Sequence, residues 1–369
     1  MALGGIDVAE LVDDHEPEDD LGHAARRRST VLWVGGLSAG LLVTLVLAVG
    51  LGAVGIAPGT VARVVGHHLV GWPSEVVWTP AQDSIVWRVR LPRVILGALV
   101  GAALAVCGVA LQAMVRNLLA DPYLLGVTSG ASTGAAAAIL FGLGAGFGEN
   151  ALSASAFLGA LAASVAVFLV ARAGGRITSL RLLMAGVAVG YALYAATSFL
   201  IFAADSAEGA RSVLFWLLGS LSLARWSIPL AVVVVVVCLT IALLMVWGRR
   251  LDALAIGDET AHTLGVPPTR FRMQLLVVVS LCVGSIVAAS GGIGFVGLVI
   301  PHVARRFVGA GHGRVIPVAA LIGAIFLVWA DVVARTVLEP RELPIGIITA
   351  LVGAPFLLIL VRRFHASGA

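Results

Sequence analysis

Long runs of apolar residues, separated by short polar stretches, cover most of the chain after residue 30. A bilayer core of roughly 30 Å needs about 20 apolar residues for each helix that crosses it, and about ten runs approach that length. They lie near residues 31–54, 94–115, 124–143, 151–171, 182–203, 228–247, 273–289, 295–308, 315–337 and 345–360. The pattern predicts an all-α fold, a polytopic membrane bundle of about ten transmembrane helices.

The composition favours a membrane protein over a soluble helical bundle. Of the 369 residues, 60% are hydrophobic and only 12% are charged, whereas soluble domains carry roughly 25% charged residues. Glycine and alanine are dense in the apolar runs, as in "GALVGAALAVCG" and "SGASTGAAAAI". Small residues let helix backbones approach closely, so we expect the spans to pack tightly.

The distribution of charge predicts the orientation of the bundle. Residues 1–28 are polar and acidic, contain "VDDHEPEDD" and end in three arginines, and we interpret them as a disordered cytoplasmic tail. With the N-terminus inside, the arginines of the tail and the inner loops outnumber those outside, as the positive-inside rule requires. The sequence therefore predicts that residues 29–365 form a multi-pass domain in the cell (plasma or inner) membrane, with both termini cytoplasmic.

The charged and sulfur-containing residues exclude several classes of chemistry. The chain contains no lysine, because all 24 basic residues are arginine. A Walker A loop needs a lysine to reach the nucleotide phosphates, so this chain carries no such loop, and if ATP drives the protein, another subunit must bind it. The net charge of +4 indicates inner-loop arginines rather than nucleic-acid binding. Cys107, Cys238 and Cys282 are interpreted as packing residues, and no cluster of His, Cys and carboxylates has metal-ligand spacing.

The polar segment 250–270, "RLDALAIGDETAHTLGVPPTR", lies between the sixth and seventh predicted spans. Asp252 and Asp258 are candidate caps of two short helices. Gly265 can take the left-handed conformation that ends a helix, and Pro267 prevents its continuation. In the predicted orientation this segment faces the cytoplasm. It could be a loop on lipid headgroups, but its acids would be repelled there, so a docking element for a cytoplasmic partner is favoured.

Three blocks of sequence carry a resemblance to a known family. They are "RLPRVILGALVGAALAVCGVALQAMVRNLLADPYLLGVTSGA", "AIGDETAHTLGV" and the stretch that runs from "GGIGFVGLVIPHVARRFVGAGHGRV" to "ELPIGIITALVGAPFLLIL". Together they resemble the FecCD family of ABC importer permeases, which includes vitamin B12, iron-siderophore and haem permeases. The resemblance extends from about residue 31 to residue 363, and the acidic tail lies outside it.

The resemblance implies a complete transport machine in which this chain is the permease and not an enzyme. Permeases of the family have ten helices per subunit and pair with a second permease subunit, in a homodimer or a related heterodimer. Two cytoplasmic ATPase subunits hold the ATP and Mg, so no cofactor is expected on this chain. A substrate-binding protein delivers the cargo from outside. The expected cargo is a metal chelate, with a ferric siderophore first and haem or cobalamin as alternatives.

The resemblance also assigns site residues on both sides of the membrane. The segment 250–270 resembles the coupling helices that sit in a cleft of the ATPase. Asn117 and Leu119 match positions of the cytoplasmic gate, with Leu118 where the family has a proline. Thr178 and Ser179 fall in the loop that forms the other half of such gates. The expected ATPase-coupling residues are Asp258, Glu259, Ala261, His262, Leu264 and Gly265.

On the outer side, Arg90, Arg93 and Arg335 match the arginines that family permeases present to glutamates of the binding protein. A guanidinium suits this contact because it binds a carboxylate bidentately and stays charged. Simpler roles are interfacial anchoring for the first two arginines and a local helix pair with Asp331 for Arg335.

Two other classes of function remain as alternatives. A secondary transporter driven by protons or sodium usually buries acidic or histidine relays within its spans. Here Asp331 is nearly the only acid in a predicted span, and Arg335 can neutralise it. An intramembrane enzyme is disfavoured because no nucleophile triad, metal set or carboxylate pair recurs at membrane depth. His302 is interpreted as a structural residue.

Overall fold

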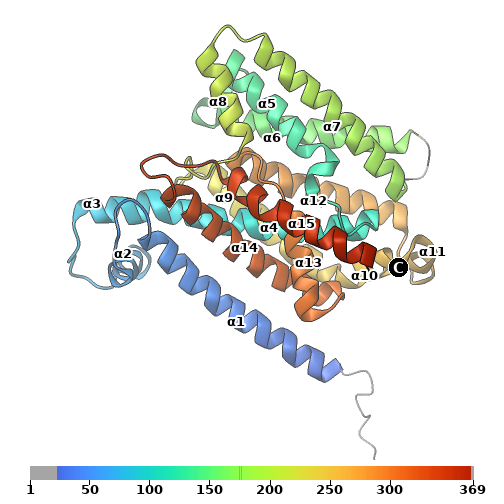
Figure 1. Cartoon of the computed structure of the whole chain (residues 1–369), viewed down its shortest axis with the longest axis horizontal. Coiled ribbons are helices and arrows are strands. Elements are labelled where there is room, and N and C mark those ends of the chain that lie inside the picture. Colours follow the sequence, from blue (N-terminus) through green and yellow to red (C-terminus); the bar gives the residue numbers. More distant parts are fainter. Residues whose placement is uncertain (1–22, 174, 176, 367–369) are drawn as a thin grey trace, which may run out of the picture.

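The computed structural model describes residues 23–173, 175 and 177–366, and within these ranges the only regular elements are helices (Figure 1). They are α1 His23–Gly50, α2 Pro58–Val70, α3 Pro80–Asp83, η2 Ser84–Arg90, α4 Leu91–Val115, η3 Pro122–Leu125, α5 Val127–Phe141, η4 Ala145–Asn150, α6 Ala151–Arg172, α7 Ser179–Phe202, α8 Ala207–Leu217, α9 Ile228–Val246, α10 Gly248–Ile256, α11 Asp258–Thr263, α12 Pro268–Ser290, α13 Val296–Val308, α14 His312–Thr336 and α15 Ile345–Ala366.

Each predicted span corresponds to one helix, and the all-helical fold is confirmed. Within the described residues, 7 helices are long and apolar enough to cross a membrane. The remaining predicted spans fall on α5 and α13, which are shorter helices, and on α15, whose apolar part is Ile345–Leu360. The sequence analysis missed α2 and α8, which are short and lie in connections between spans.

The predicted orientation supplies names for the two ends of the bundle. We call the end with α2 and α3 the outer end, and the end with α10 and α11 the inner end (Figure 1). α15 finishes at the inner end, and α1 starts on the same side. The first turns of α1, from His23, are helical although residues up to 28 were expected in the tail. The rest of that predicted tail lies outside the described residues.

α4 lies at the centre of the bundle, and α1 lies at its edge. In the span that contains α4, 83% of an apolar 18-residue stretch is buried, against only 11% of the corresponding stretch in α1. α4 contacts α9, α12, α13 and α14. α1 lies apart from the bundle over much of its length and contacts mainly α14 (Figure 1). An apolar helix with so little protein around it must face lipid or another subunit.

Glycines allow the closest helix crossings around α4. A β-carbon on Gly101 would lie 2.1 Å from the carbonyl oxygen of Gly323 in α14, and one on Gly108 would lie 2.0 Å from that of Gly297 in α13. No side chain fits at such distances. Helix association in lipid depends on close van der Waals packing, so these positions specify how α13 and α14 sit against α4.

The short helices α5 and α13 begin inside the bundle rather than at its surface. A β-carbon on Gly297, in the first turn of α13, would lie 2.5 Å from the Pro122 ring and 3.0 Å from the carbonyl oxygen of Leu104. Leu104 is near the middle of α4, so the entry to α5 and the start of α13 meet at mid-height. Helices that start at mid-height need fewer residues to reach one surface, and such discontinuous helices are common in transporters.

The segment 250–270 forms two short helices as predicted, but the aspartates do not cap them. α10 begins at Gly248, so Asp252 lies within it. Gly257 is the N-cap of α11 and Asp258 is its first residue. Both carboxylates instead bind partners in other helices, which local sequence cannot reveal. Gly265 has a φ of 76° and stops the segment in the expected left-handed conformation.

We predict that Gly101→Val destabilises the protein by separating α4 from α14. Overpacking a tight site costs about 1–3 kcal/mol, and the neighbour here is backbone that cannot turn away. The thermal midpoint of the purified protein in detergent should fall by several degrees. Gly35→Val in α1, where an added β-carbon meets nothing within 4 Å, is the control. Equal midpoints for the two variants would contradict the role of this crossing.

Candidate functional site

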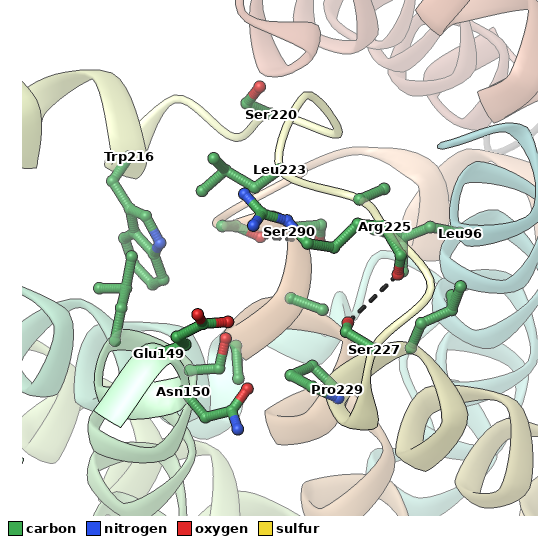
Figure 2. A pocket seen from close by; sticks show the side chains of 17 residues that line it. Leu96, Glu149, Asn150, Trp216, Ser220, Leu223, Arg225, Ser227, Pro229 and Ser290 are labelled. Carbon is green, nitrogen blue, oxygen red and sulfur yellow. Dashed lines mark hydrogen bonds between the residues drawn. The ribbon is translucent and has the colours of Figure 1, made fainter. Parts of the chain in front are cut away.

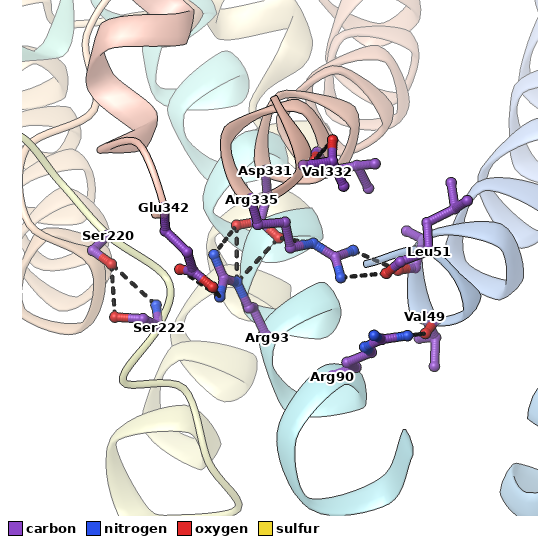
Figure 3. Close-up of polar contacts among 12 residues, drawn as sticks. Val49, Leu51, Arg90, Arg93, Ser220, Ser222, Asp331, Val332, Arg335 and Glu342 are labelled. Carbon is purple, nitrogen blue, oxygen red and sulfur yellow. Dashed lines mark hydrogen bonds and ion pairs between the residues drawn. The ribbon is translucent and has the colours of Figure 1, made fainter. Parts of the chain in front are cut away.

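The outer end contains a buried ion-pair network centred on Asp331 (Figure 3). Arg93 donates from Nε to Asp331 Oδ1 at 2.9 Å and from Nη1 to Glu342 Oε1 at 3.0 Å. Arg335 lies one helical turn from Asp331, with its Nε 3.3 Å from Oδ2. The network joins α4, α14 and the loop before α15. The local pair of Arg335 with Asp331, considered from sequence as an alternative, is confirmed.

Arg90 and Arg335 also bind the end of α1 (Figure 3). Arg90 donates to the carbonyl oxygens of Val49 and Gly50, both at 3.0 Å, and to that of Val54 at 2.7 Å. Arg335 donates to the carbonyl oxygen of Leu51 at 2.6 Å and also to that of Ala48. The last carbonyls of a helix lack partners within it and carry its negative dipole end. The two arginines, which belong to other helices, therefore cap the C-terminal end of α1.

The three outer arginines have internal partners, and their residues are only 8–9% exposed. The structure thus brings together the residues that the resemblance selected, but it turns their guanidinium groups inward. Glu342 is the exception in the network, because its side chain is 46% exposed. Sequence reasoning missed the Arg93 pairs, since its partners are 238 and 249 residues away along the chain.

Two open cavities are lined by residues of α8 and of the 220–227 loop, and the second of them reaches the network at Glu342. The first has a volume of about 430 Å³ and lies between α4, η4, the 220–227 loop and the end of α12; it carries Glu149, Asn150 and Arg225 (Figure 2). The second, of about 840 Å³, is lined by Arg211, Phe215 and Glu342 among others. Glu342 thus joins the buried network to the surface. Both cavities mix charged with aromatic side chains.

At the inner end, the segment 250–270, which we call the coupling segment after its expected role, has a surface face and a buried face. Glu259, His262, Leu264 and Gly265 are exposed, and Asp258 is partly exposed. Ala261 is 0% exposed, so its assignment to the ATPase contact is corrected. α11 has only six residues, and one side of it packs against the rest of the protein. Ala261 is on that side.

Arg272, in the second turn of α12, was missed by the sequence analysis. It is the largest fully buried side chain, at 1% exposure. Its Nη2 donates to Asp258 Oδ1 at 2.7 Å and its Nη1 to Oδ2 at 2.8 Å, a bidentate pair. Nη2 also donates to Ser179 Oγ at 3.0 Å, and Nε to the carbonyl oxygen of Met114 at 3.2 Å. The arginine therefore connects α11, α7 and α4.

The pKa of the Asp258 carboxyl lies below its usual value, chiefly because of the hydrogen bonds from Arg272. Burial opposes this shift, while the charges of Arg272 and Arg116 add to it. A lowered pKa means that the carboxylate is stabilised in the folded protein. The pair therefore persists at neutral pH and is lost only when the pH falls through the lowered pKa.

Of the predicted gate residues, Ser179 contacts this arginine directly. Ser179 begins α7 and donates from Oγ to the Met114 carbonyl oxygen at 3.2 Å. Thr178 caps the same helix by accepting from the Arg181 amide at 3.3 Å. Asn117 follows α4 and accepts from the Leu119 amide through Oδ1 at 2.9 Å. That hydrogen bond orders the turn at which Leu118 replaces the family's proline.

A second polar contact joins the coupling segment to α14. Asp252 Oδ1 lies 2.6 Å from His312 Nδ1 and accepts from the His312 amide at 2.9 Å. The pKa of the Asp252 carboxyl lies below its usual value. Burial raises this pKa, but the hydrogen bonds and the charge of His312 lower it by a larger amount. α10 is therefore held at the start of α14.

The described residues contain no group of three or more His, Cys, Asp or Glu placed to hold a metal ion. His302 packs edge-on against Phe356, with ring centroids 5.9 Å apart.

The fold, an apolar bundle with 7 helices long enough to cross a membrane among its described residues, is that of a polytopic membrane protein. The model of the FecCD transport family matches residues 40–363. The chain therefore belongs to the FecCD transport family, which confirms the resemblance found in the sequence.

Curated relatives cover most of the chain. It is 42% identical over 333 residues to the uncharacterized ABC transporter permease protein YvrB of Bacillus subtilis, covering 89% of this chain and 92% of that one. It is 46% identical over 280 residues to the cobalamin import system permease protein BtuC of Halobacterium salinarum, covering 75% and 73%. With the hemin transport system permease protein HmuU of Yersinia pestis the identity is 39%, covering 78% and 87%.

A solved structure has the same fold. It is described as an inward-facing conformation of a metal-chelate type ABC transporter, and it superposes with a TM-score of 0.77 at 33% sequence identity. The match covers 89% of this chain and 98% of that one.

We predict that Asp331→Asn is strongly destabilising, because it leaves the buried Arg93 and Arg335 without their common counter-ion. Breaking a buried pair in this way costs about 3–5 kcal/mol. Glu342→Gln is the matched acid-to-amide control, and it should cost about 1 kcal/mol or less because Glu342 is exposed. Thermal unfolding in detergent measures both changes. An Asp331→Asn protein as stable as the control would refute the central position of Asp331.

Proposed function

We propose that this chain is the permease subunit of an ATP-driven, binding-protein-dependent importer of a metal chelate. One observation carries the proposal: a polar two-helix segment projects from the inner end of a FecCD-family bundle and exposes Glu259, His262 and Leu264. A chain without lysine has no Walker A loop. Such a surface suits a partner that binds the nucleotide.

The names of the relatives support the cargo class. They include permeases named for cobalamin and for hemin, and the related structure is described as of metal-chelate type. We propose a ferric siderophore as the first choice of cargo, with haem and cobalamin as alternatives. All three are bulky metal chelates, so the proposal commits to that chemistry.

We propose that all ten predicted spans cross or enter the membrane and that the inner end faces the cytoplasm. The arginine distribution supports this orientation. The short helices α5 and α13 are consistent with the first part of the proposal, because they start at mid-height and need to cover only part of the bilayer. Both termini are then cytoplasmic, and the bundle lies in the cell (plasma or inner) membrane.

The proposed partners follow from the two ends and the exposed sides. Two ATPase subunits, which carry ATP and Mg, dock at the coupling segment, and a second permease subunit pairs with this bundle. A substrate-binding protein docks at the outer end, near Arg90, Arg93 and Arg335. Because these arginines already have internal partners, a docking glutamate would reach Arg93 by displacing the exposed carboxylate of Glu342.

The proposed mechanism is alternating access. ATP binding and hydrolysis in the partner displace α10 and α11, and the inner gate around Asn117, Leu119, Thr178 and Ser179 opens in response. A short helix moves as a unit where a loop would bend. The alternative, proton- or sodium-driven transport, would need a free ionisable group within the spans. Asp331 does not provide one, because two arginines bind it.

We predict that uptake depends on the partner's nucleotide and not on ion gradients. Proteoliposomes should contain the permease, its ATPase and its binding protein, and ferric siderophore, hemin and cobalamin should be supplied in parallel. An ATPase variant that binds but does not hydrolyse ATP should abolish accumulation while an imposed proton gradient is intact. Accumulation by the permease alone would overturn the proposed function.

We predict that Leu264→Asp releases the ATPase subunits from the purified complex. Leu264 is 63% exposed on the coupling segment, and an acid there would replace apolar contact with the partner by an unpaired charge. Leu69→Asp is the matched control, because Leu69 is 68% exposed on α2 at the opposite end. Co-purification of the ATPase measures the outcome. A complex that withstands Leu264→Asp would remove the segment from the interface.

A further inference from the structure

Arg272 binds three helix ends that belong to different parts of the proposed transport cycle. Asp258 is the first residue of α11, in the coupling segment, and its side chain is 40% exposed. Ser179 is the first residue of α7, and Met114 lies in the last turn of α4, just before the Asn117 turn. Arg272 therefore lies between the segment that receives movement and the helix ends that form the predicted gate.

The burial of Arg272 makes this connection stiff. A guanidinium at 1% exposure cannot exchange its protein partners for water. If α11 moved away alone, the charge of Arg272 would be left uncompensated inside the protein, which is strongly unfavourable. A displacement of Asp258 must therefore either carry Arg272 with it or break the pair at a large free-energy cost.

The hydrogen-bond geometry extends the connection beyond one ion pair. Nη2 of Arg272 donates both to Asp258 Oδ1 at 2.7 Å and to Ser179 Oγ at 3.0 Å. Ser179 Oγ donates in turn to the Met114 carbonyl oxygen, which also accepts from Arg272 Nε. A shift of the guanidinium thus changes the contacts of α7 and α4 together. No flexible loop intervenes between Asp258 and these helix ends.

We propose that Arg272 is the positioning residue that transmits the displacement of the coupling segment to the inner ends of α4 and α7. This inference rests on the proposed function and deepens it. Arg272 touches neither cargo nor nucleotide and acts through Asp258, Ser179 and the Met114 carbonyl. The rigid planar fork of an arginine suits this task, because its donors keep a fixed spacing.

Arg272→Lys is the informative substitution. A lysine keeps the charge beside Asp258, but its single ammonium cannot reproduce the bidentate pair and the bonds to Ser179 and Met114 simultaneously. Arg306→Lys is the matched control, since Arg306 is exposed in the last turn of α13 and lies outside the segment 250–270. Ser179→Ala is a second test variant that removes only the hydroxyl.

The readout is the distance between the two inner helix ends, measured by spin labels. Leu118→Cys and Leu180→Cys place labels at sites that are 43% and 67% exposed. Cys238 is exposed and is replaced by alanine, whereas Cys107 and Cys282 are buried and stay unlabelled. The full complex with its ATPase subunits is measured in lipid nanodiscs, without nucleotide and after trapping with Mg-ATP and vanadate.

The parent complex and Arg306→Lys should show the same nucleotide-dependent change of distance. Arg272→Lys should lose more than half of that change while the ATPase subunits remain bound and hydrolyse ATP. Ser179→Ala should show an intermediate loss. A purely structural role of Arg272 would lower the thermal midpoint but leave the change of distance in the folded complex intact.

The outcomes separate this inference from the function on which it rests. No change of distance in the parent complex would overturn the proposed ATP-driven gate, and the role of Arg272 with it. A full change in both the parent and Arg272→Lys would overturn only the role of Arg272. If Arg272→Lys does not assemble, Ser179→Ala decides, and a full change in that variant overturns the inference.

Discussion

A buried guanidinium in an apolar bundle must find its hydrogen-bond acceptors within the protein, and this constraint organises both ends of the molecule. Arg93 and Arg335 share Asp331 at the outer end, while Arg272 binds Asp258 at the inner end. In each case the acceptors come from several helices. Because removal of one partner would leave a buried charge, these helices are obliged to stay together.

The two ends use the constraint differently. At the outer end, the arginines bind α14, the end of α1 and the loop before α15, so that elements distant in sequence form one surface. At the inner end, the carboxylate that binds Arg272 belongs to a short helix with an exposed face. The outer network is therefore suited to hold a surface in place. The inner network is suited to move when the short helix α11 is displaced.

Between these ends the bundle depends on backbone contact. α4 meets α14 at Gly101 and Gly323, and α13 at Gly108 and Gly297. These crossings leave no room for side chains, so the helices cannot slide past one another without clashes. Movement in such a bundle is more readily accommodated by shifts of helix ends than by repacking of the middle. The contacts of Arg272 with Asp258 and Ser179 lie at such helix ends.

The sequence by itself determined the elements that local patterns encode. Apolar runs located the long helices because a helix that lies in a bilayer needs a continuous apolar stretch of its own, and motif order revealed the family. The left-handed conformation of Gly265, which ends the coupling segment, was also encoded by the local sequence. Only the tertiary structure decided that Asp252 and Asp258 bind His312 and Arg272 rather than cap helices, that Ala261 faces inward, and that α5 and α13 begin at mid-height. These features depend on contacts between residues far apart in the chain, which a helical period does not specify, since it shows which faces are apolar but not which helix covers them.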